Sequence, residues 1–250
     1  MKQSKNSNYV FGIHAIIEAI KSGKSIEKVL LRKEQQGDLS GELYQLIIGH
    51  KIPFQFVPVE KLNRITRKNH QGALAFVSPV EYIDLEQIVP RIYENGDVPF
   101  LLMLDGITDV RNLGAICRSA ECAGVHAVIV PAKGSAQINA DAVKTSAGAL
   151  NHLQMSRVEK PVLALKFLKD SGVQVIGASE KAQISYMECN WTYPVVLVMG
   201  AEDTGISSSV QNMCDQLVSI PVFGKVGSLN VSVAASVMLY EAIRQRQMHA

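Results

Sequence analysis

Apolar residues recur at helical spacing near the start of the chain. Ile13, Ile16, Ile17 and Ile20 lie on one face of a predicted helix, and Gly23 follows as a stop signal. Short apolar runs and amphipathic stretches then alternate. They predict strands at residues 28–32, 53–57 and 73–77 and helices at residues 39–48 and 59–65. Three helices alternating with three strands within 80 residues are typical of a small α/β domain.

The pattern changes near residue 100. Five short, almost continuous apolar runs predict strands covered on both faces, at residues 101–105, 127–130, 174–178, 195–200 and 217–220. Helical patterns lie at residues 113–123, 140–150, 161–171, 208–214 and 231–246. Such an alternation predicts a mainly parallel α/β sheet, whose ligands bind beyond the carboxyl ends of the strands.

The segment between the first α/β region and the parallel-sheet region contains several prolines and glycines. Pro90, Gly96 and Pro99 lie in it, so residues 81–99 are predicted to be a linker with one short helix at residues 85–93. The expected organisation is therefore a first domain of residues 1–80, a linker of residues 81–99 and a second domain of residues 100–250.

Composition narrows the class of protein. The chain has 250 residues, of which 47% are hydrophobic, so it is long enough to bury a sizeable core in one or two domains. Its apolar runs are far too short for a membrane span, and residues 1–12 have no apolar region of the kind a secretory signal needs. The four cysteines form no Cys-x-x-Cys pair, which favours a reduced, cytoplasmic protein without a membrane partner.

Charge is divided unevenly along the chain. Residues 1–80 hold 12 Lys/Arg and 6 Asp/Glu, whereas residues 81–250 hold 13 and 17, so the net charge of +2 conceals a basic first third. A polyanionic partner for that third and an ordinary solvated surface account for this division equally well.

Three loops of the second domain combine glycines with polar residues directly after predicted strands, at residues 105–114, 199–205 and 220–230. Any one of them is an ordinary turn, but three on one sheet favour a shared site. Dinucleotide, phosphate-loop and Gly-x-Ser-x-Gly signatures are absent from the sequence. The six histidines are scattered without metal-ligand spacing, so no metal is expected.

These three loops closely resemble the three motifs of SpoU/TrmH-type RNA 2′-O-ribose methyltransferases of the SPOUT superfamily. The most specific part is residues 228–232 (SLNVS) of the third motif. Residues 11–15 (FGIHA) and 70–75 (HQGALA) are similar to the family's ribosomal-protein-like RNA-binding extension. The resemblance covers residues 9–246 and is closest to the bacterial branch that methylates a guanosine ribose in 23S rRNA.

The resemblance implies a fold and a cofactor that spacing alone does not. Family members tie the C-terminal α/β domain into a deep trefoil knot, an exception to the rule against threading. S-adenosyl-L-methionine binds in the knot, largely through backbone groups, without a metal. The corresponding residues here are Ala178, Ser179, Met199, Gly200, Ile220, Ser228 and Leu229. The family is usually a homodimer whose active sites draw residues from both subunits.

Five catalytic positions carry over by resemblance: Asn112, Arg118, Glu202, Ser228 and Asn230. The implied reaction is an in-line transfer of a methyl group to a ribose 2′-oxygen. A free guanidinium has a pKa above ~12, so Arg118 is interpreted as holding the adjacent phosphate and stabilising the developing alkoxide rather than as a base. The other residues would position Arg118 and the ribose. Ala201 stands where the family motif has asparagine.

The first domain is expected to bind RNA rather than DNA, mainly through phosphates. Candidate contacts are Arg32, Arg64, Arg67, Lys68 and His70, with Lys28 and Lys33 beside them. Ribosomal RNA is the favoured partner, because enzymes of the tRNA branch often lack a large N-terminal domain. Methylation of tRNA, methylation elsewhere in rRNA that confers resistance to a ribosome-directed antibiotic, and a non-catalytic RNA-binding protein of the same fold remain open alternatives.

Overall fold

The computed structural model describes residues 9–33 and 38–248, without the side chains of residues 38 and 39. Most of the segment in which the sequence shows no secretory signal therefore lies outside the described residues. The chain divides into two compact units. The first unit is Met1–Glu81 with Ile138–Ala140, and the second is Tyr82–Gln137 with Asp141–Ala250. Each unit has its own sheet and its own core.

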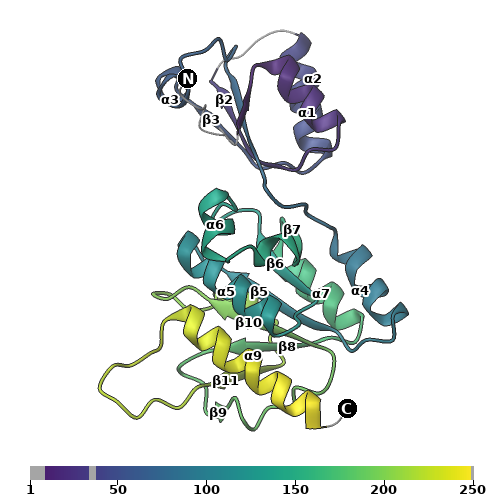
Figure 1. Cartoon of the computed structure of the whole chain (residues 1–250), viewed down its shortest axis with the longest axis vertical. Coiled ribbons are helices and arrows are strands. Elements are labelled where there is room, and N and C mark those ends of the chain that lie inside the picture. The colour runs from purple at the N-terminus through teal and green to yellow at the C-terminus, as the bar shows by residue number, and fades with distance from the viewer. Residues whose placement is uncertain (1–8, 34–37, 249–250) are drawn as a thin grey trace. The chain divides into compact units, whose positions relative to one another are not determined.

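The first unit is built on a four-stranded mixed sheet with helices on both faces (Figure 1). Its elements are β1 (Tyr9–Phe11), α1 (Ile13–Lys21), β2 (Ile26–Arg32), α2 (Asp38–Gly49), β3 (Phe54–Val57), α3 (Val59–Ile65) and β4 (Ala73–Val77). The strand order is β1-β4-β2-β3; β2 and β3 are parallel, and the other pairs are antiparallel. Six of these seven elements follow the sequence prediction. Strand β1 does not, because three residues carry too little pattern.

Strand β2 explains why an apolar run without alternation forms a strand. Val29 and Leu31 pack against α1 and α2, while Leu30 between them packs with Leu62 of α3 on the other face. Because successive side chains of a strand point to opposite faces, a strand covered on both sides is apolar at every position.

The second unit contains a seven-stranded sheet of order β7-β6-β5-β10-β8-β11-β9, in which every pair is parallel. The strands are β5 (Phe100–Asp105), β6 (Ala127–Pro131), β7 (Gln154–Val158), β8 (Gln174–Ala178), β9 (Ile184–Ser185), β10 (Val195–Gly200) and β11 (Gln216–Ser219). The helices are α4 (Leu85–Glu94), α5 (Val110–Cys122), α6 (Ala140–Thr145), α7 (Pro161–Asp170), α8 (Ser208–Gln211) and α9 (Val231–Met248), with a short 3₁₀ turn at Ala149–Asn151. The predicted α/β class with a mainly parallel sheet is confirmed.

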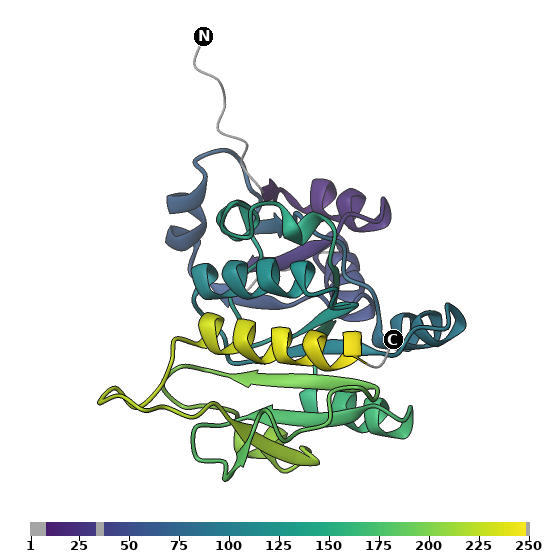
Figure 2. The same ribbon diagram turned by 60° about the horizontal axis from the view of Figure 1, so that its bottom comes forward.

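Helices cover this sheet on both faces (Figures 1 and 2). Helices α4 and α7 pack on one face, and α5 and α9 pack side by side. Strands β5 and β10 lie next to each other in the middle and are buried at all of their positions. Among the described residues, none of the helices is both long and apolar enough to cross a lipid bilayer.

Helix α4 corrects the expectation of a linker over residues 81–99. Leu85, Ile88, Val89 and Ile92 belong to the core of the second unit, together with residues of β5, β6, β8 and β10. The prolines and glycines of this segment lie near the ends of the helix and, in the case of Pro90, inside it, so they do not mark a linker. The apolar spacing within the segment, i, i+3, i+4 and i+7, was the better signal.

Other differences from the prediction are local. The helix expected over residues 140–150 ends at Thr145, because Ala147 and Gly148 adopt positive φ angles of 51° and 89°. The helix expected over residues 208–214 ends at Gln211. Strands β7 and β9 are additions to the predicted set. The trefoil knot expected in the C-terminal domain stays a prediction.

Candidate functional site

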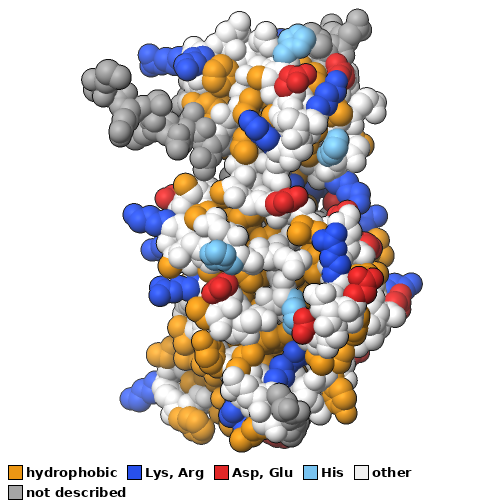
Figure 3. Space-filling view, turned by 45° about the vertical axis from the view of Figure 1, so that its right-hand side comes forward, with side chains coloured by type: hydrophobic (Ala, Val, Ile, Leu, Met, Phe, Trp, Pro, Cys, Tyr) orange, Lys and Arg blue, Asp and Glu red, His pale blue; other side chains and the backbone are white. Residues whose placement is uncertain are grey.

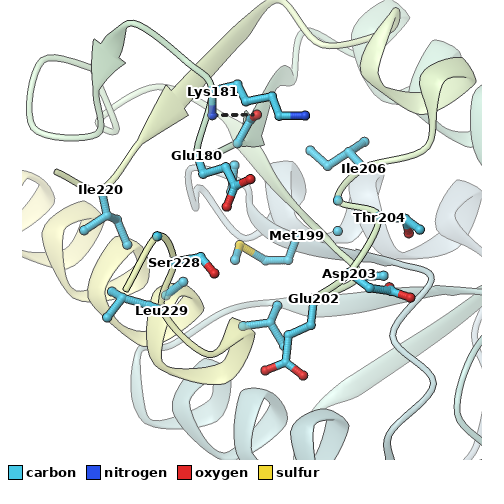
Figure 4. A pocket seen from close by; sticks show the side chains of 18 of the residues that line it. Glu180, Lys181, Met199, Glu202, Asp203, Thr204, Ile206, Ile220, Ser228 and Leu229 are labelled. Carbon is cyan, nitrogen blue, oxygen red and sulfur yellow. Dashed lines mark hydrogen bonds between the residues drawn. The ribbon is translucent and has the colours of Figure 1, made fainter. Parts of the chain in front are cut away.

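Four neighbouring strands end at the same edge of the second sheet. Strands β5, β10, β8 and β11 are adjacent and parallel, so the loops that follow them meet there. A pocket of about 210 Å³ opens between the loops after β8, β10 and β11 and the beginning of α9 (Figure 4). The site therefore lies where the alternation of strands and helices predicted a ligand.

All seven residues expected at a cofactor line this pocket: Ala178, Ser179, Met199, Gly200, Ile220, Ser228 and Leu229. In Figure 4, Met199 reaches into the middle, and Ile220, Ser228 and Leu229 face it from the segment before α9. The structure thus brings these residues together, while their role toward a cofactor stays a prediction.

Sequence reasoning missed Glu180 and Lys181, which follow β8 and line the same pocket. The Lys181 backbone N–H donates a hydrogen bond to Ser179 Oγ at 3.3 Å, which folds the loop back at the end of the strand (Figure 4). Their position directly after a buried strand was the available signal, the same one that identified the other three loops.

A tight turn shapes the second motif. The Ala201 N–H donates to the Gly205 carbonyl at 3.0 Å, and the Gly205 N–H donates to the Ala201 carbonyl at 2.9 Å. A Cβ atom on Gly200 would lie 2.2 Å from both the Gly205 carbonyl carbon and the Ile206 nitrogen. Only glycine allows this close return of the main chain. The turn is further tied to the end of β5, because the Ser207 N–H donates to the buried Asp105 carboxylate at 2.7 Å.

Three of the five expected catalytic residues form one closed hydrogen-bond network. Asn112 Nδ2 donates to Glu202 Oε2 at 3.2 Å, and Asn230 Nδ2 donates both to Glu202 Oε1 and, at 3.1 Å, to Asn112 Oδ1. The three residues follow β5, β10 and β11, so segments up to 118 positions apart meet here. Glu202 also lines the pocket, which places the network at the pocket wall.

Helix ends explain why a carboxylate is stable at this position. Asn230 directly precedes α9, and its Oδ1 accepts the Ser232 N–H at 2.9 Å, as an N-cap does. Asp109 caps α5 in the same way by accepting the Arg111 N–H at 2.7 Å. The positive ends of two helix dipoles thus lie at the network that contains Glu202.

Helices α5 and α9 run side by side in the same direction. Asn112 contacts Asn230 at their N-terminal ends, and about two turns further on Ser236 Oγ donates to Ser119 Oγ at 2.7 Å. Arg118 lies beside Ser119 and is exposed. No hydrogen bond or ion pair joins its guanidinium to the described part of the chain. The expectation that Asn112, Glu202 and Asn230 position Arg118 is therefore not met within one chain.

The remaining catalytic candidate, Ser228, lines the pocket but takes no part in the network. It is exposed, as is the whole segment of residues 221–230. Its position beside Leu229 and opposite Met199 suits contact with a pocket ligand better than contact with Glu202 (Figure 4).

In the first unit the basic candidates are accessible. Arg32, Arg64, Arg67 and Lys68 are all exposed. On the face of the molecule shown in Figure 3, lysine and arginine side chains are spread over the surface rather than gathered in one patch. Any contact with a polyanion would then be assembled from single charges.

His70 requires a correction. Its side chain is buried, its Nδ1 accepts the Gly72 N–H at 3.0 Å, and its Nε2 lies 2.9 Å from Asn63 Oδ1. Because Nδ1 accepts, Nε2 carries the proton and donates to Asn63. Both ring nitrogens are used inside the domain, so His70 holds the loop in shape and has no free ring nitrogen to offer RNA.

Three of the four cysteines, Cys117, Cys189 and Cys214, are fully or partly buried. Burial raises the pKa of the Cys117 thiol to about 12 and the pKa values of Cys189 and Cys214 to about 11, which leaves these thiols protonated and poorly nucleophilic. Within residues 9–33 and 38–248, His, Cys, Asp and Glu form no group of three or more that could hold a metal ion.

Comparison with known proteins decides the family. Residues 99–240 match the SpoU rRNA Methylase family, and residues 9–83 match a domain described as RNA 2′-O ribose methyltransferase substrate binding. The chain belongs to the SpoU family of RNA methyltransferases. A Staphylococcus saprophyticus protein assigned to the TrmH family of tRNA/rRNA methyltransferases is 36% identical to this SpoU-family chain over 237 residues, 95% of each chain. YacO of Bacillus subtilis, with the same assignment, is 32% identical over 97% of this chain and 98% of its own.

Solved structures of the SpoU family agree. The SpoU methyltransferase AviRb from Streptomyces viridochromogenes, in complex with the cofactor AdoMet, has a TM-score of 0.61 at 26% identity, covering 96% of this chain and 90% of AviRb. The A. aeolicus TrmH/SpoU tRNA modifying enzyme has a TM-score of 0.56 at 31% identity, covering 66% of this chain and 85% of its own. The names of these relatives include both tRNA and rRNA, so family membership does not fix the substrate.

Proposed function

We propose that this SpoU-family chain is an S-adenosyl-L-methionine-dependent methyltransferase that modifies the ribose 2′-oxygen of a guanosine in 23S rRNA. The network of Asn112, Glu202 and Asn230 carries the proposal. Two amides from distant segments hold one carboxylate at the wall of a pocket, and pure RNA binding does not require that arrangement.

The residues that line the pocket suit the binding of S-adenosylmethionine. Ala178 and Gly200 line the pocket with little or no side chain, and Met199 and Leu229 supply apolar surface for an adenosine. Bound there, the cofactor would supply a methyl group on a positively charged sulfur. The cofactor complex of the AviRb neighbour supports this assignment. No metal takes part in the proposal.

Glu202 has the central role among the chain's own groups. Each of its oxygens accepts an amide hydrogen bond and keeps a further lone pair, which can accept a hydrogen bond from a ribose hydroxyl. Asn112 and Asn230 fix the carboxylate, and Ser228 contacts the pocket ligand. Alignment of the 2′-oxygen with the methyl group is then the chief contribution of the site.

The position of Arg118 suggests that the proposed active site is completed by a second copy of the chain. It is exposed and forms no hydrogen bond or ion pair with the described residues of its own chain, so we assign it to the site of a partner subunit in a homodimer. There it would hold the phosphate beside the ribose and stabilise the developing alkoxide.

Exposed apolar side chains support such a homodimer. Val233 and Tyr240 of α9 are seven residues apart, on the same side of the helix, and are 48% and 54% exposed. Phe223 and Val226 of the segment before α9 are 97% and 74% exposed. Apolar surface of this kind marks a protein interface.

We favour rRNA over tRNA because this chain carries the first unit, whereas a relative named as a tRNA modifying enzyme matches only part of the chain. The A. aeolicus tRNA modifying enzyme matches only 66% of this chain, whereas AviRb and the TrmH-family relatives match 95% or more. Methylation of tRNA is the second candidate, supported by the mixed naming of those relatives. Location in the cytoplasm, where both RNAs are made in bacteria, is part of the same proposal.

The deciding experiment gives the protein labelled S-adenosylmethionine with separate pools of unmodified rRNA and tRNA. We expect label in the rRNA pool, mapped to the 2′-oxygen of a guanosine in 23S rRNA. Label confined to tRNA would establish the second candidate. Cofactor binding by calorimetry without label in either pool would overturn the enzymatic proposal in favour of a non-catalytic RNA-binding protein.

A further inference from the structure

One face of the first unit's sheet is covered only in part. Its cluster of buried residues, Leu30, Val57, Leu62 and Leu74, is closed by the short helix α3. Tyr9 and Phe11 of β1 and Phe76 of β4 lie on the same face, pack against this cluster and remain partly exposed.

The three rings form one connected group. Ring centroids are 6.2 Å apart for Tyr9 and Phe11 and 6.4 Å apart for Tyr9 and Phe76. Strand register extends the group across the sheet, because Tyr9 pairs with Phe76 and Phe76 pairs with Lys28. Two aromatic rings and a lysine thus stand in one row over three strands, with Phe11 beside the row.

Positive charge borders the rings. Lys68 Nζ lies 5.6 Å from the centroid of the Phe11 ring, and Lys28 Nζ donates to Gln55 Oε1 at 3.0 Å. Around Phe76 the strand positions of this face hold aromatic, aliphatic, amide or basic side chains. Glu27 of β2 lies at a register shift, and its Oε1 accepts the Ile138 N–H at 3.2 Å. The face is therefore suited to an anionic partner with flat, apolar parts.

We propose that this aromatic face, made of Tyr9, Phe11, Phe76, Lys28 and Lys68, binds a single-stranded segment of the RNA substrate by base stacking. Aromatic rings on a sheet stack unpaired bases of any identity, and lysines beside them meet the phosphates. A duplex, whose bases are already stacked, gains nothing from such rings. The inference rests on the proposed function for the nature of the RNA, but it concerns binding and not methyl transfer.

The opposite face of the same sheet offers a matched control. Phe54 and Phe56 of β3 form an edge-to-face pair with centroids 5.7 Å apart, and Phe56 is 47% exposed. Phe54 packs with the core under α1 and α2. An exposed phenylalanine at Phe56 is thus available on the same unit but away from the aromatic face.

The test measures binding of fluorescently labelled RNA to the full-length chain, with one oligonucleotide single-stranded and the same sequence in a duplex. Substitution F76L or F11L, which keeps an apolar side chain but removes the ring, should weaken single-strand binding about fivefold or more. F76Y should restore it, because tyrosine stacks equally well, and F56L should leave it within about twofold. Duplex binding should change little in all variants.

Ultraviolet crosslinking followed by mass spectrometry supplies a second readout that does not depend on a variant folding. Adducts on the peptides that contain Tyr9, Phe11 or Phe76 are expected. Unchanged single-strand binding in both leucine variants, or adducts only on other peptides, would overturn the proposal. Loss of the dimer in F76L with RNA binding intact would identify a protein interface instead. Stacking without methyl transfer would contradict only the proposed function.

Discussion

In the second unit three polar residues of the site are joined by hydrogen bonds, whereas the side chains of the arginines expected to meet RNA in the first unit form no hydrogen bond or ion pair with the described residues. Glu202 accepts hydrogen bonds from two asparagines, one in the first turn of α5 and one directly before α9, and the turn beside it closes through two backbone hydrogen bonds. Arg32, Arg64 and Arg67, by contrast, are exposed side chains on separate elements. One substitution in a hydrogen-bonded network is expected to lower activity strongly, because it leaves the other members without a partner. Substitutions of separate charges are expected to have small effects on binding that add up.

Arg118 belongs to the second unit, yet its side chain, like those of the arginines in the first, is exposed and forms no hydrogen bond or ion pair with the described residues. If it serves the site of a partner subunit, R118A should lower methyl transfer by about 10²- to 10³-fold, the usual effect of removing one group that stabilises a developing charge. Cofactor affinity by calorimetry should stay nearly unchanged. R91A, which removes an exposed arginine of α4, is the control.

Mixed dimers sharpen this prediction. A dimer of one R118A chain and one E202Q chain has one site with both substitutions and one site with neither, provided that each site takes Arg118 from the partner. Mixing the two impaired variants should then restore up to about half of the activity of one wild-type dimer. No recovery, with mixed dimers shown by mass spectrometry, would place Arg118 in the site of its own chain.

The Glu202 network is the next test. In E202Q the new amide turns at least one donor toward the amides of Asn112 and Asn230, so one of the present hydrogen bonds breaks and the negative charge disappears. We expect methyl transfer to fall by about 10- to 100-fold, since a charge-assisted hydrogen bond is worth about 1.5–3 kcal/mol. E121Q, on the exposed side of α5, should be without effect. Equal activity of E202Q and wild type would remove the network from the mechanism.

The sequence predicted these two regions with different success. The loops at residues 199–205 and 220–230 were predicted from the continuous apolar strands before them, a strong local signal, whereas the individual pocket residues came from the resemblance to the SpoU/TrmH family. The loop geometry at Gly200 follows from a glycine whose Cβ would strike the main chain. The hydrogen bonds among Asn112, Glu202 and Asn230 join positions 28 to 118 residues apart, and no local pattern encodes that contact.

Errors of the sequence-based predictions have a common cause. The prolines of residues 81–99 predict a linker, although the apolar face of α4 is buried in the second unit. The polar neighbours of His70 predict a contact with RNA, yet Gly72 and Asn63 occupy its ring nitrogens. In both cases composition is visible in the sequence, but the tertiary partner is not.

A substitution at Gly200 tests how rigid the turn beside the Glu202 network is. A Cβ at this position would lie 2.2 Å from main-chain atoms that cannot move aside, so G200A should unfold at lower temperature, with a free energy of unfolding smaller by about 1–3 kcal/mol. Cofactor affinity should fall with it, because Gly200 lines the pocket. G224A, where an added Cβ meets nothing within 4 Å, should leave the melting temperature unchanged. A G200A protein as stable as wild type would show that the turn can open.

Single charges of the first unit should give the smallest effects. Replacement of Arg64 or Arg67 by glutamine should weaken RNA binding only about two- to fivefold at moderate salt, since each arginine neutralises at most one phosphate. The slope of log affinity against log salt should decrease in magnitude by about 0.7–0.9 for each phosphate that is no longer neutralised. K24Q, on the turn after α1, serves as the matched control and should change neither quantity. A far larger loss of affinity from one arginine, with an unchanged salt slope, would mean that this arginine holds the RNA through a specific bonded contact. The RNA contact of the first unit would then depend on specific hydrogen bonds, as the site of the second unit does.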